Sequence, residues 1–294
     1  MSRAGATPME NLISLLDLEV LEQDLYRGNS PQSEWQRVFG GQVIGQSLVA
    51  AQRTVDKSRI VHSLHAYFMR PGDPSTPIVY TVDRIRDGSS FATRRVVAIQ
   101  HGKAIFSLEA SFQVEEPGLE HQFEMPKVVP PEDLPSLSQM SEELLASAPE
   151  QIKRYWRRDR PLEIRPISLA HYLSDEKLPP FQSVWVRPTG PVPDDRIVKA
   201  SVLAYLSDML LLDTTLFAHG RSLFDPTMQV ASLDHSMWFH RPFDFDDWLL
   251  YTMDSPNTNG ARGLSRGSFF ARDGRLIASV AQEGLIRERR KQPG

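Results

Sequence analysis

The sequence predicts an α+β protein made of two similar units, each a long helix followed by antiparallel strands. Apolar residues recur at helical spacing after Phe39, and period-two alternation then appears in several short stretches up to Val114. The same order of helix and strands returns in the second half of the chain. A helix followed by a run of strands is typical of α+β folds and not of doubly wound ones.

The first unit is expected within residues 1–120. Residues 12–26 mix apolar and acidic side chains, which is consistent with a short helix and a first strand. Gly40 and Gly41 open a helix that we expect to reach Val55, and the paired glycines allow another group to approach its N-terminus closely. Strands are predicted around residues 64–68, 79–83 and 104–114.

Residues 121–160 are expected to connect the two units, because prolines and scattered acidic residues become frequent after Glu116. A polar helix is predicted within this connector, at 141–157. The second unit, 161–294, is predicted to contain a long helix at 198–216. Its strands are expected at 162–166, 183–186, 230–239, 248–254, 263–271 and 275–286.

Two pairs of tetrapeptides show that the halves repeat each other. The segment that begins at Phe68 matches the one that begins at Phe239, and the segment at Tyr80 matches the one at Tyr251. Both pairs are 171 positions apart, which indicates a gene duplication. A duplicated unit recreates a symmetric dimer inside one chain, so we expect the functional site at the seam between the halves.

Asp208 is the most unusual residue of the predicted second helix. Its neighbours one helical turn away are Ala204, Tyr205, Leu211 and Leu212. A carboxylate buried among such side chains costs several kcal/mol unless it is paired or its pKa rises. Two interpretations remain open from periodicity: a buried, chemically active carboxylate, or a carboxylate that faces a solvated groove.

Composition excludes several classes of function. The 294 residues carry a formal net charge of −4, which argues against nucleic acid or an anionic membrane as the main partner. The chain has no cysteine, so thiolate nucleophiles and Cys-ligated metals are excluded. The eight histidines show no metal-ligand spacing. No cofactor, metal or membrane span is therefore expected, and a cytoplasmic location is predicted.

Six separated phrases occur in an order that resembles the acyl-CoA thioesterase II family over residues 10–288. They are VFGGQVIGQSLVAAQ (38–52), HSLHAYFMRPGDP (62–74), LEIRPI (162–167), LAYLSDMLLL (203–212), LDHSMWFHRPF (233–243) and AQEGLIR (281–287). The resemblance implies a double hotdog, in which an antiparallel sheet wraps a long helix twice in one chain. It also implies hydrolysis of acyl-CoA to fatty acid and coenzyme A, a role in lipid metabolism, and a homo-oligomer, either a dimer or a tetramer.

The resemblance assigns a water-orienting set to Asp208, Ser232 and Gln282. Many members have threonine at the position of Ser232, so serine keeps the hydroxyl and loses the methyl group that restricts its rotamer. We expect Asp208 to accept the proton of a water that the other two residues orient, with no covalent intermediate. The residues expected to contact the acyl-CoA substrate are Gly40, Gly41, Phe68 and Trp238.

The repeat predicts that each chain has one such site. At the spacing of 171 Val61 stands in the place of Ser232, and the first long helix has no acidic residue. The last strands match with one inserted residue, at a spacing of 172, which puts Ala110 in the place of Gln282. The first unit therefore lacks all three groups. It is expected to supply one wall of the site and the helix end at Gly40.

Other functions remain open from the sequence. A hotdog enoyl-CoA hydratase would use an Asp with a His base, for which His62, His65 and His235 are candidates. A protein that binds acyl-CoA without turnover would keep the pocket without activating water. A serine-hydrolase triad is disfavoured, because the chain lacks a G-x-S-x-G motif and Ser232, Asp234 and His235 would alternate between faces of one strand. Candidates for the coenzyme A phosphates are Arg94 and Arg95 with Lys103, or Arg262 and Arg266.

Overall fold

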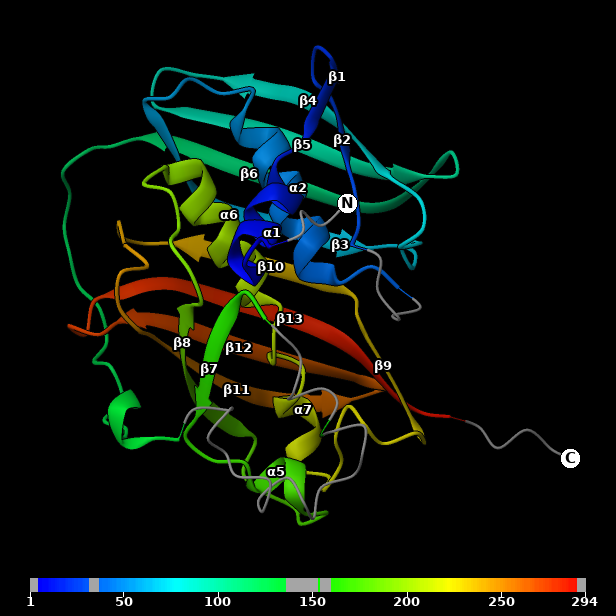
Figure 1. Ribbon diagram of the computed structural model, residues 1–294, viewed down its shortest axis with the longest axis vertical. Coiled ribbons are helices and arrows are strands. Elements are labelled where there is room, and N and C mark those ends of the chain that lie inside the picture. The colour runs from blue at the N-terminus through cyan, green and yellow to red at the C-terminus, as the bar shows by residue number, and fades with distance from the viewer. Residues whose placement is uncertain (1–4, 32–36, 136–152, 154–159, 290–294) are drawn as a thin grey trace, which may run out of the picture.

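A computed structural model describes residues 5–31, 37–135, 153 and 160–289 of the chain (Figure 1). The expected polar helix at 141–157 lies outside these residues except for Lys153. The first unit contains α1 (Pro8–Leu16), β1 (Glu19–Glu22), β2 (Leu25–Gly28), α2 (Gly40–Gln52), β3 (Arg59–Phe68), β4 (Ile78–Asp87), β5 (Phe91–Gln100) and β6 (Lys103–Val114). The helix α2 thus ends three residues before the predicted Val55.

The second unit repeats this order after the short 3-10 helix η1 (Pro131–Asp133). It contains β7 (Leu162–Pro166), α5 (Ala170–Leu173), β8 (Phe181–Pro188), α6 (Arg196–Ser207), α7 (Thr214–Phe217), β9 (Met228–Ser232), β10 (Asp234–Phe239), β11 (Leu249–Asn259), β12 (Arg262–Ala271) and β13 (Leu276–Glu288). The expected double hotdog is confirmed: each unit is a long helix partly wrapped by antiparallel strands.

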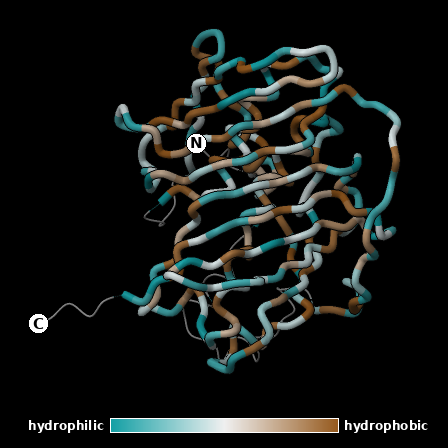
Figure 2. Tube along the Cα trace, turned by 180° about the vertical axis from the view of Figure 1, so that it is seen from behind, coloured by the Kyte–Doolittle hydropathy of each residue, from teal (hydrophilic) through white to brown (hydrophobic). Residues whose placement is uncertain are grey.

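The two units share one 13-stranded sheet, in which the antiparallel pair β3 and β10 joins the halves. The strand order is β1-β2-β4-β5-β6-β3-β10-β13-β12-β11-β8-β7, and β9 pairs with β13 beside β10. Figure 1 shows α1, α2 and α6 on one face of this curved sheet, and Figure 2 shows the strands crossing the opposite face. The buried sides of α2, α6 and the strands form one core across both units.

The long helices α2 and α6 cross at close range because glycines lie at the contact. A Cβ on Gly41 would lie 2.3 Å from the carbonyl oxygen of Tyr205, and one on Gly45 would lie 3.1 Å from that of Ser201. The small residues of α2 therefore let the backbones of the two units approach each other. This crossing brings the N-terminus of α2 to the C-terminal end of α6.

The expectation of one helix over 198–216 is wrong, because α6 ends at Ser207 and α7 begins only at Thr214. The Tyr251 hydroxyl donates a hydrogen bond of 2.8 Å to the carbonyl of Ser207, and Leu210 adopts a left-handed backbone with φ of 66°. At the break the Ser207 carbonyl is thus satisfied from β11 and not by a further helical turn. It leaves Asp208 at the C-cap of α6.

The expected strand at 230–239 is also interrupted, at Leu233. Ser232 pairs with Gly284 and Ser236 pairs with Ala281, so β9 and β10 together carry one more residue than β13 over this stretch. Such a bulge resets the alternation of side chains between the two faces. A register shift at His62 interrupts β3 at the equivalent repeat position.

Candidate active site

The three residues of the expected water-orienting set come together at the seam between the units. Gln282 of β13 donates from Nε2 to Asp208 Oδ1 at 2.9 Å and to the Ser232 hydroxyl at 2.6 Å. Ser232, at the end of β9, donates to the same carboxylate oxygen at 3.4 Å. Three segments that are remote in sequence therefore converge on one carboxylate.

The carboxylate of Asp208 also lies against the first turn of α2. The Gly41 backbone N–H donates to it, and the N-cap of α2, Phe39, provides no side-chain hydrogen bond. By contrast, the N-terminus of α6 is capped by Asp195, which accepts from the N–H groups of Ile197 and Val198. The partial positive charge of the α2 N-terminus is thus directed at the site.

Burial decides the ionisation of Asp208. Enclosure by the protein raises its pKa to about 6, although hydrogen bonds from Gln282, the Gly41 N–H and Ser232 favour the charged form. The residue nevertheless keeps partial contact with solvent. Of the two interpretations left open by the sequence, the structure thus favours the enclosed carboxylate, which is poised to exchange a proton near neutral pH.

His235 extends this cluster and was not expected in it from strand alternation. Because of the bulge at Leu233, its ring reaches the same side as Ser232, with Nδ1 3.2 Å from Gln282 Oε1 and Nε2 2.9 Å from the Ser207 hydroxyl. Burial lowers the pKa of His235 to about 4, so the ring is neutral at pH 7. Comparison of the two repeats could have pointed to His235, because the first unit has Leu64 at the equivalent position.

The carboxylate of Asp208 determines which groups donate and which accept in this series of hydrogen bonds. An ionised Asp208 can only accept, so the Gln282 amide must direct its NH₂ group to it and its carbonyl to His235. His235 then donates from Nδ1, and its Nε2 contacts the Ser207 hydroxyl, which also bonds to the Ala204 carbonyl. Both ring nitrogens are thus engaged within the cluster, and burial lowers the pKa of His235, so the ring is a weak base. This argues against the hydratase interpretation.

The other two histidines considered for a hydratase lie outside the cluster. His62 contacts the Ser111 hydroxyl at 2.8 Å, and His65 contacts that of Ser236 at 3.0 Å. In the described ranges, no group of three or more histidines and acidic residues is arranged to hold a metal ion. None of the described helices has the length and apolar character needed to span a bilayer.

A pocket of about 330 Å³ opens beside Ser232. Gly40 and Phe68, two of the residues expected to contact substrate, line it, together with Arg37 and Arg70. Gly41 lies one residue deeper, against Tyr205 of α6. The volume lies within the range typical of small-molecule pockets.

Trp238 is not brought to this pocket. It points away from the core on β10, is 37% exposed, and packs its ring edge-on against His65. The reason is strand alternation, since Met237 beside it is fully buried. The arginines considered for phosphate binding are engaged in ion pairs: Arg94 with Asp87, Arg95 with Glu109, Arg262 with Glu283 and Arg266 with Asp254.

Known proteins match both halves of the chain. A family model described as "Acyl-CoA thioesterase" matches residues 152–285, and one described as "Acyl-CoA thioesterase N-terminal domain" matches residues 30–113. The protein named acyl-CoA thioesterase 2 of Haemophilus influenzae is 42% identical over 279 residues, which cover 95% of this chain and 98% of that protein. The chain belongs to the acyl-CoA thioesterase family. The resemblance seen in its sequence motifs is confirmed.

Solved structures share the fold of this chain. The acyl-CoA thioesterase II TesB2 of Mycobacterium marinum is 43% identical, with a TM-score of 0.77 over 96% of this chain and all of that one. A protein of Alicyclobacillus acidocaldarius described as having a hot dog fold is only 18% identical, yet gives a TM-score of 0.76 over 95% of this chain and 98% of that one. The second likeness concerns the fold alone.

Proposed function

We propose that this thioesterase hydrolyses acyl-CoA by direct attack of a water molecule held by Asp208, Ser232 and Gln282. The observation that carries the proposal is the mutual hydrogen bonding of these three side chains beside a pocket that spans both units. In the first unit Val61 and Ala110 take the places of Ser232 and Gln282, so this unit cannot form the same cluster.

The base is Asp208. Its pKa of about 6 leaves it mostly ionised at pH 7, yet basic enough to accept a proton from the attacking water. Ser232 and Gln282 orient the water lone pair toward the thioester carbonyl. The water oxygen bonds to the carbonyl carbon while its proton passes to Asp208. The tetrahedral intermediate then expels the coenzyme A thiolate, which recovers a proton from Asp208.

The oxyanion donor in this mechanism is the Gly40 backbone N–H in the first turn of α2, because the Gly41 N–H already donates to Asp208. This turn begins at Gly40, which lines the pocket and contacts the Asp208 carboxylate. The absence of a side-chain cap on this helix leaves the turn open to a substrate oxygen. Gly40 and Gly41 thus act through their backbones, and Phe68 forms an apolar wall for the acyl group.

Arg37 and Arg70 are the basic residues that line this pocket, and we assign contact with the coenzyme A phosphates to them. Arg70 is oriented by a hydrogen bond of 2.6 Å from its Nη1 to the carbonyl of Ala104. Trp238 has no part in this assignment. The rings of Trp238 and Tyr67 are exposed on the outer face of the sheet. Because exposed aromatic rings favour contact with another chain, we infer that the protein forms a homo-oligomer, a dimer or a tetramer, through this face. We place this oligomer in the cytoplasm.

The proposed function is tested by release of free thiol from acyl-CoAs of different chain length, comparing wild type with Asp208→Asn. We expect thiol release by the wild type and a fall of about 100-fold or more in the variant. A wild type that releases no thiol would favour a hydratase or a non-catalytic acyl-CoA binding protein. An unaffected variant would leave the reaction in place and overturn the assignment of the base.

A further inference from the structure

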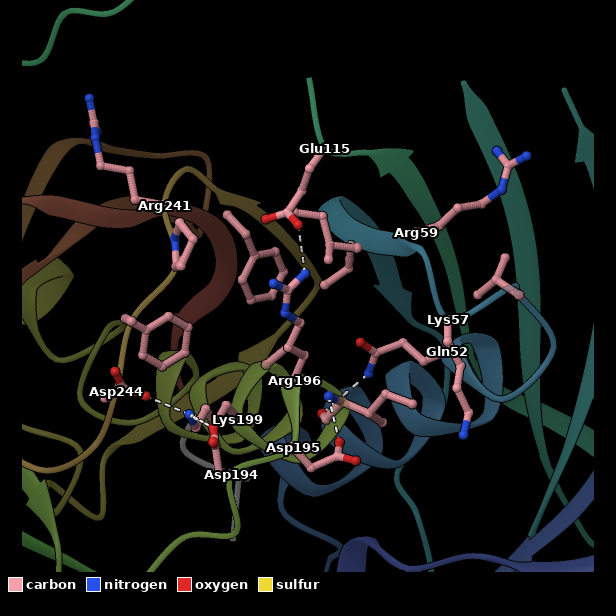
Figure 3. Close-up of a pocket in the computed structure, with 18 of the residues that line it drawn as sticks. Gln52, Lys57, Arg59, Glu115, Asp194, Asp195, Arg196, Lys199, Arg241 and Asp244 are labelled. Atoms are coloured by element: carbon pink, nitrogen blue, oxygen red, sulfur yellow. Dashed lines mark hydrogen bonds and ion pairs between the residues drawn. The ribbon is translucent and has the colours of Figure 1, made fainter. Parts of the chain in front are cut away.

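A second pocket of about 440 Å³ lies at the opposite end of the α2 and α6 pair (Figure 3). Gln52 stands at the C-terminal end of α2 and Arg196 at the N-terminus of α6, and both line it. Two further walls are the beginning of β3, at 59–61, and the end of β10 with the segment after it, at 239–244. Carboxylates also line the pocket: Asp56, Glu115, Asp194, Asp195 and Asp244. None of its lining residues belongs to the pocket beside Asp208.

The repeat relates the two pockets wall by wall. At the spacing of 171, residues 59–61 of the second pocket correspond to 230–232 of the first, and 239–243 correspond to 68–72. The helices match at a spacing of 156. Gln52 then corresponds to Asp208. Its amide donates to the carbonyl of Ile197, the counterpart of Gly41, whereas Asp208 accepts from the Gly41 N–H. The second pocket is therefore the pseudo-symmetric image of the proposed active site.

The groups proposed to activate water are missing from this image. Gln52 replaces the base Asp208, Val61 replaces Ser232, and Ala110 replaces Gln282. The helix end that faces the second pocket is also occupied, because Asp195 accepts from two N–H groups of the first turn of α6. A thioester bound there would meet neither a counterpart of the buried Asp208 carboxylate nor a free oxyanion site at the helix end.

The features that suit an acyl ligand are retained. Val55, Ile60, Ile197 and Phe243 supply apolar walls, and the volume is not smaller than that of the first pocket. Such a lining suits an aliphatic chain better than a polar metabolite.

A cation at the rim is retained as well. Arg241 corresponds to Arg70, and each guanidinium is oriented by a strand-end carbonyl, Leu276 at 3.1 Å and Ala104 at 2.6 Å. Arg196 and Lys199, by contrast, are neutralised by Glu115 and by Asp194 with Asp244. Within the described part of the chain, Arg241 forms no ion pair with a carboxylate. Its charge therefore remains available to an anionic group of a ligand.

We propose that this second pocket binds an acyl compound with an anionic head, either the acyl-CoA substrate or its fatty acid product, and leaves it unhydrolysed. The proposal rests on the assignment of the first pocket as the acyl-CoA site, since the likeness between the two defines the ligand. Each chain would then hold two acyl ligands and hydrolyse one of them.

Counting bound ligand by equilibrium dialysis tests this. The probes are the carbonyl-free thioether S-octyl-CoA, which cannot be hydrolysed, and octanoate. We expect wild type to bind two thioether molecules per chain, or one thioether and one octanoate when both are present. Either result supports ligand binding in the second pocket and shows whether that pocket accepts a coenzyme A or a carboxylate head group. One thioether per chain, with no octanoate bound beside it, overturns the proposal.

Two variants test whether the second ligand binds in this pocket. Ala200→Trp fills the pocket from α6 and should reduce binding to one thioether per chain. Arg241→Gln, on the surface, should weaken the second site by about tenfold, the size expected for loss of one charged hydrogen bond. The matched control is Arg266→Gln, which lies on β12 away from both pockets. Unchanged second-site affinity in folded Arg241→Gln and Ala200→Trp proteins would contradict the assignment.

Thiol release by wild type separates this proposal from the proposed function. Hydrolysis with a single thioether bound per chain, and no octanoate bound beside it, rejects the second pocket alone. Two bound thioethers together with an active Asp208→Asn variant reject the assigned base and leave the second pocket standing.

Discussion

Gly40 and Asp208 belong to different units, yet a Cβ on Gly40 would lie 2.6 Å from Oδ2 of Asp208. The same atom would lie 3.0 Å from the Phe68 ring. The first turn of α2 and the C-cap of α6 therefore meet at a single carboxylate. The active site depends on the seam between the repeats and not on either repeat alone.

Replacing Gly40 by alanine should impair catalysis. The added methyl group must displace either the Asp208 carboxylate or Phe68, and a displacement of about 1 Å in a catalytic group can cost about 100-fold. We expect a loss of that order in kcat/KM, measured by thiol release. Gly118→Ala is the matched control, because nothing lies within 4 Å of a Cβ at that position. Equal activity of the two variants would contradict the contact.

The Asp208→Asn variant should be inactive and more stable. The pKa of the carboxyl is raised to about 6 from 3.8, so ionisation of Asp208 destabilises the folded state by up to about 3 kcal/mol above pH 6. This cost is absent below pH 4, where the group is protonated in both states. Urea unfolding at pH 8 should therefore show a gain in the free energy of unfolding that shrinks toward pH 4. A variant less stable than wild type at pH 8 would argue that the charge is well compensated.

The rate should depend on pH through Asp208. Because the base must be ionised, kcat/KM should fall about tenfold per pH unit below an apparent pKa of about 6 and level off above it. Ionisation of His235 should not change the slope of the pH–rate profile above pH 5, because burial keeps its pKa at about 4.

The control for this pH profile is Asp213→Asn. Burial also raises the pKa of Asp213, to about 7, but its carboxylate accepts from the Tyr172 hydroxyl and lies outside the cluster. The limb near pH 6 should persist in this variant. If the fall in rate near pH 6 disappeared in Asp213→Asn, the titrating group would be Asp213 and not Asp208.

The role of His235 as a positioning residue predicts a partial effect. His235→Leu, which installs the residue found at the equivalent Leu64, removes the donor that holds the Gln282 carbonyl. We expect kcat to fall about tenfold with little change in KM, the size of one lost hydrogen bond. The limb near pH 6 should remain, because the base is still present.

The exposed residue His65 provides the control for that variant. It contacts Ser236 on the outer side of the sheet, and His65→Leu should keep the wild-type rate within about twofold. If His235→Leu abolished activity and removed the limb near pH 6, His235 would have to be the base, as in a hydratase.

Much of the fold could be predicted from local pattern. The alternation around Leu64 and Ala66, the helical spacing after Gly40, and the repeated tetrapeptides at Phe68 and Phe239 predict two helix-and-strand units, which the structure confirms. The end of α6 could not be predicted, because the sequence from 198 to 216 stays apolar and helix-compatible throughout. Its termination depends on the Tyr251 hydroxyl, which is supplied by β11, 44 residues after Ser207.

The sequence by itself determined the duplicated architecture, the family, and the asymmetry of Asp208, Ser232 and Gln282 between the halves. These depend on residue type and spacing, which a linear chain carries in full. Only the tertiary structure decided that the α2 N-terminus faces Asp208, that the bulge at Leu233 turns His235 inward, and that Trp238 points outward. Such features depend on which remote backbone groups satisfy each other's hydrogen bonds, and that pairing exists only once the two halves have packed together.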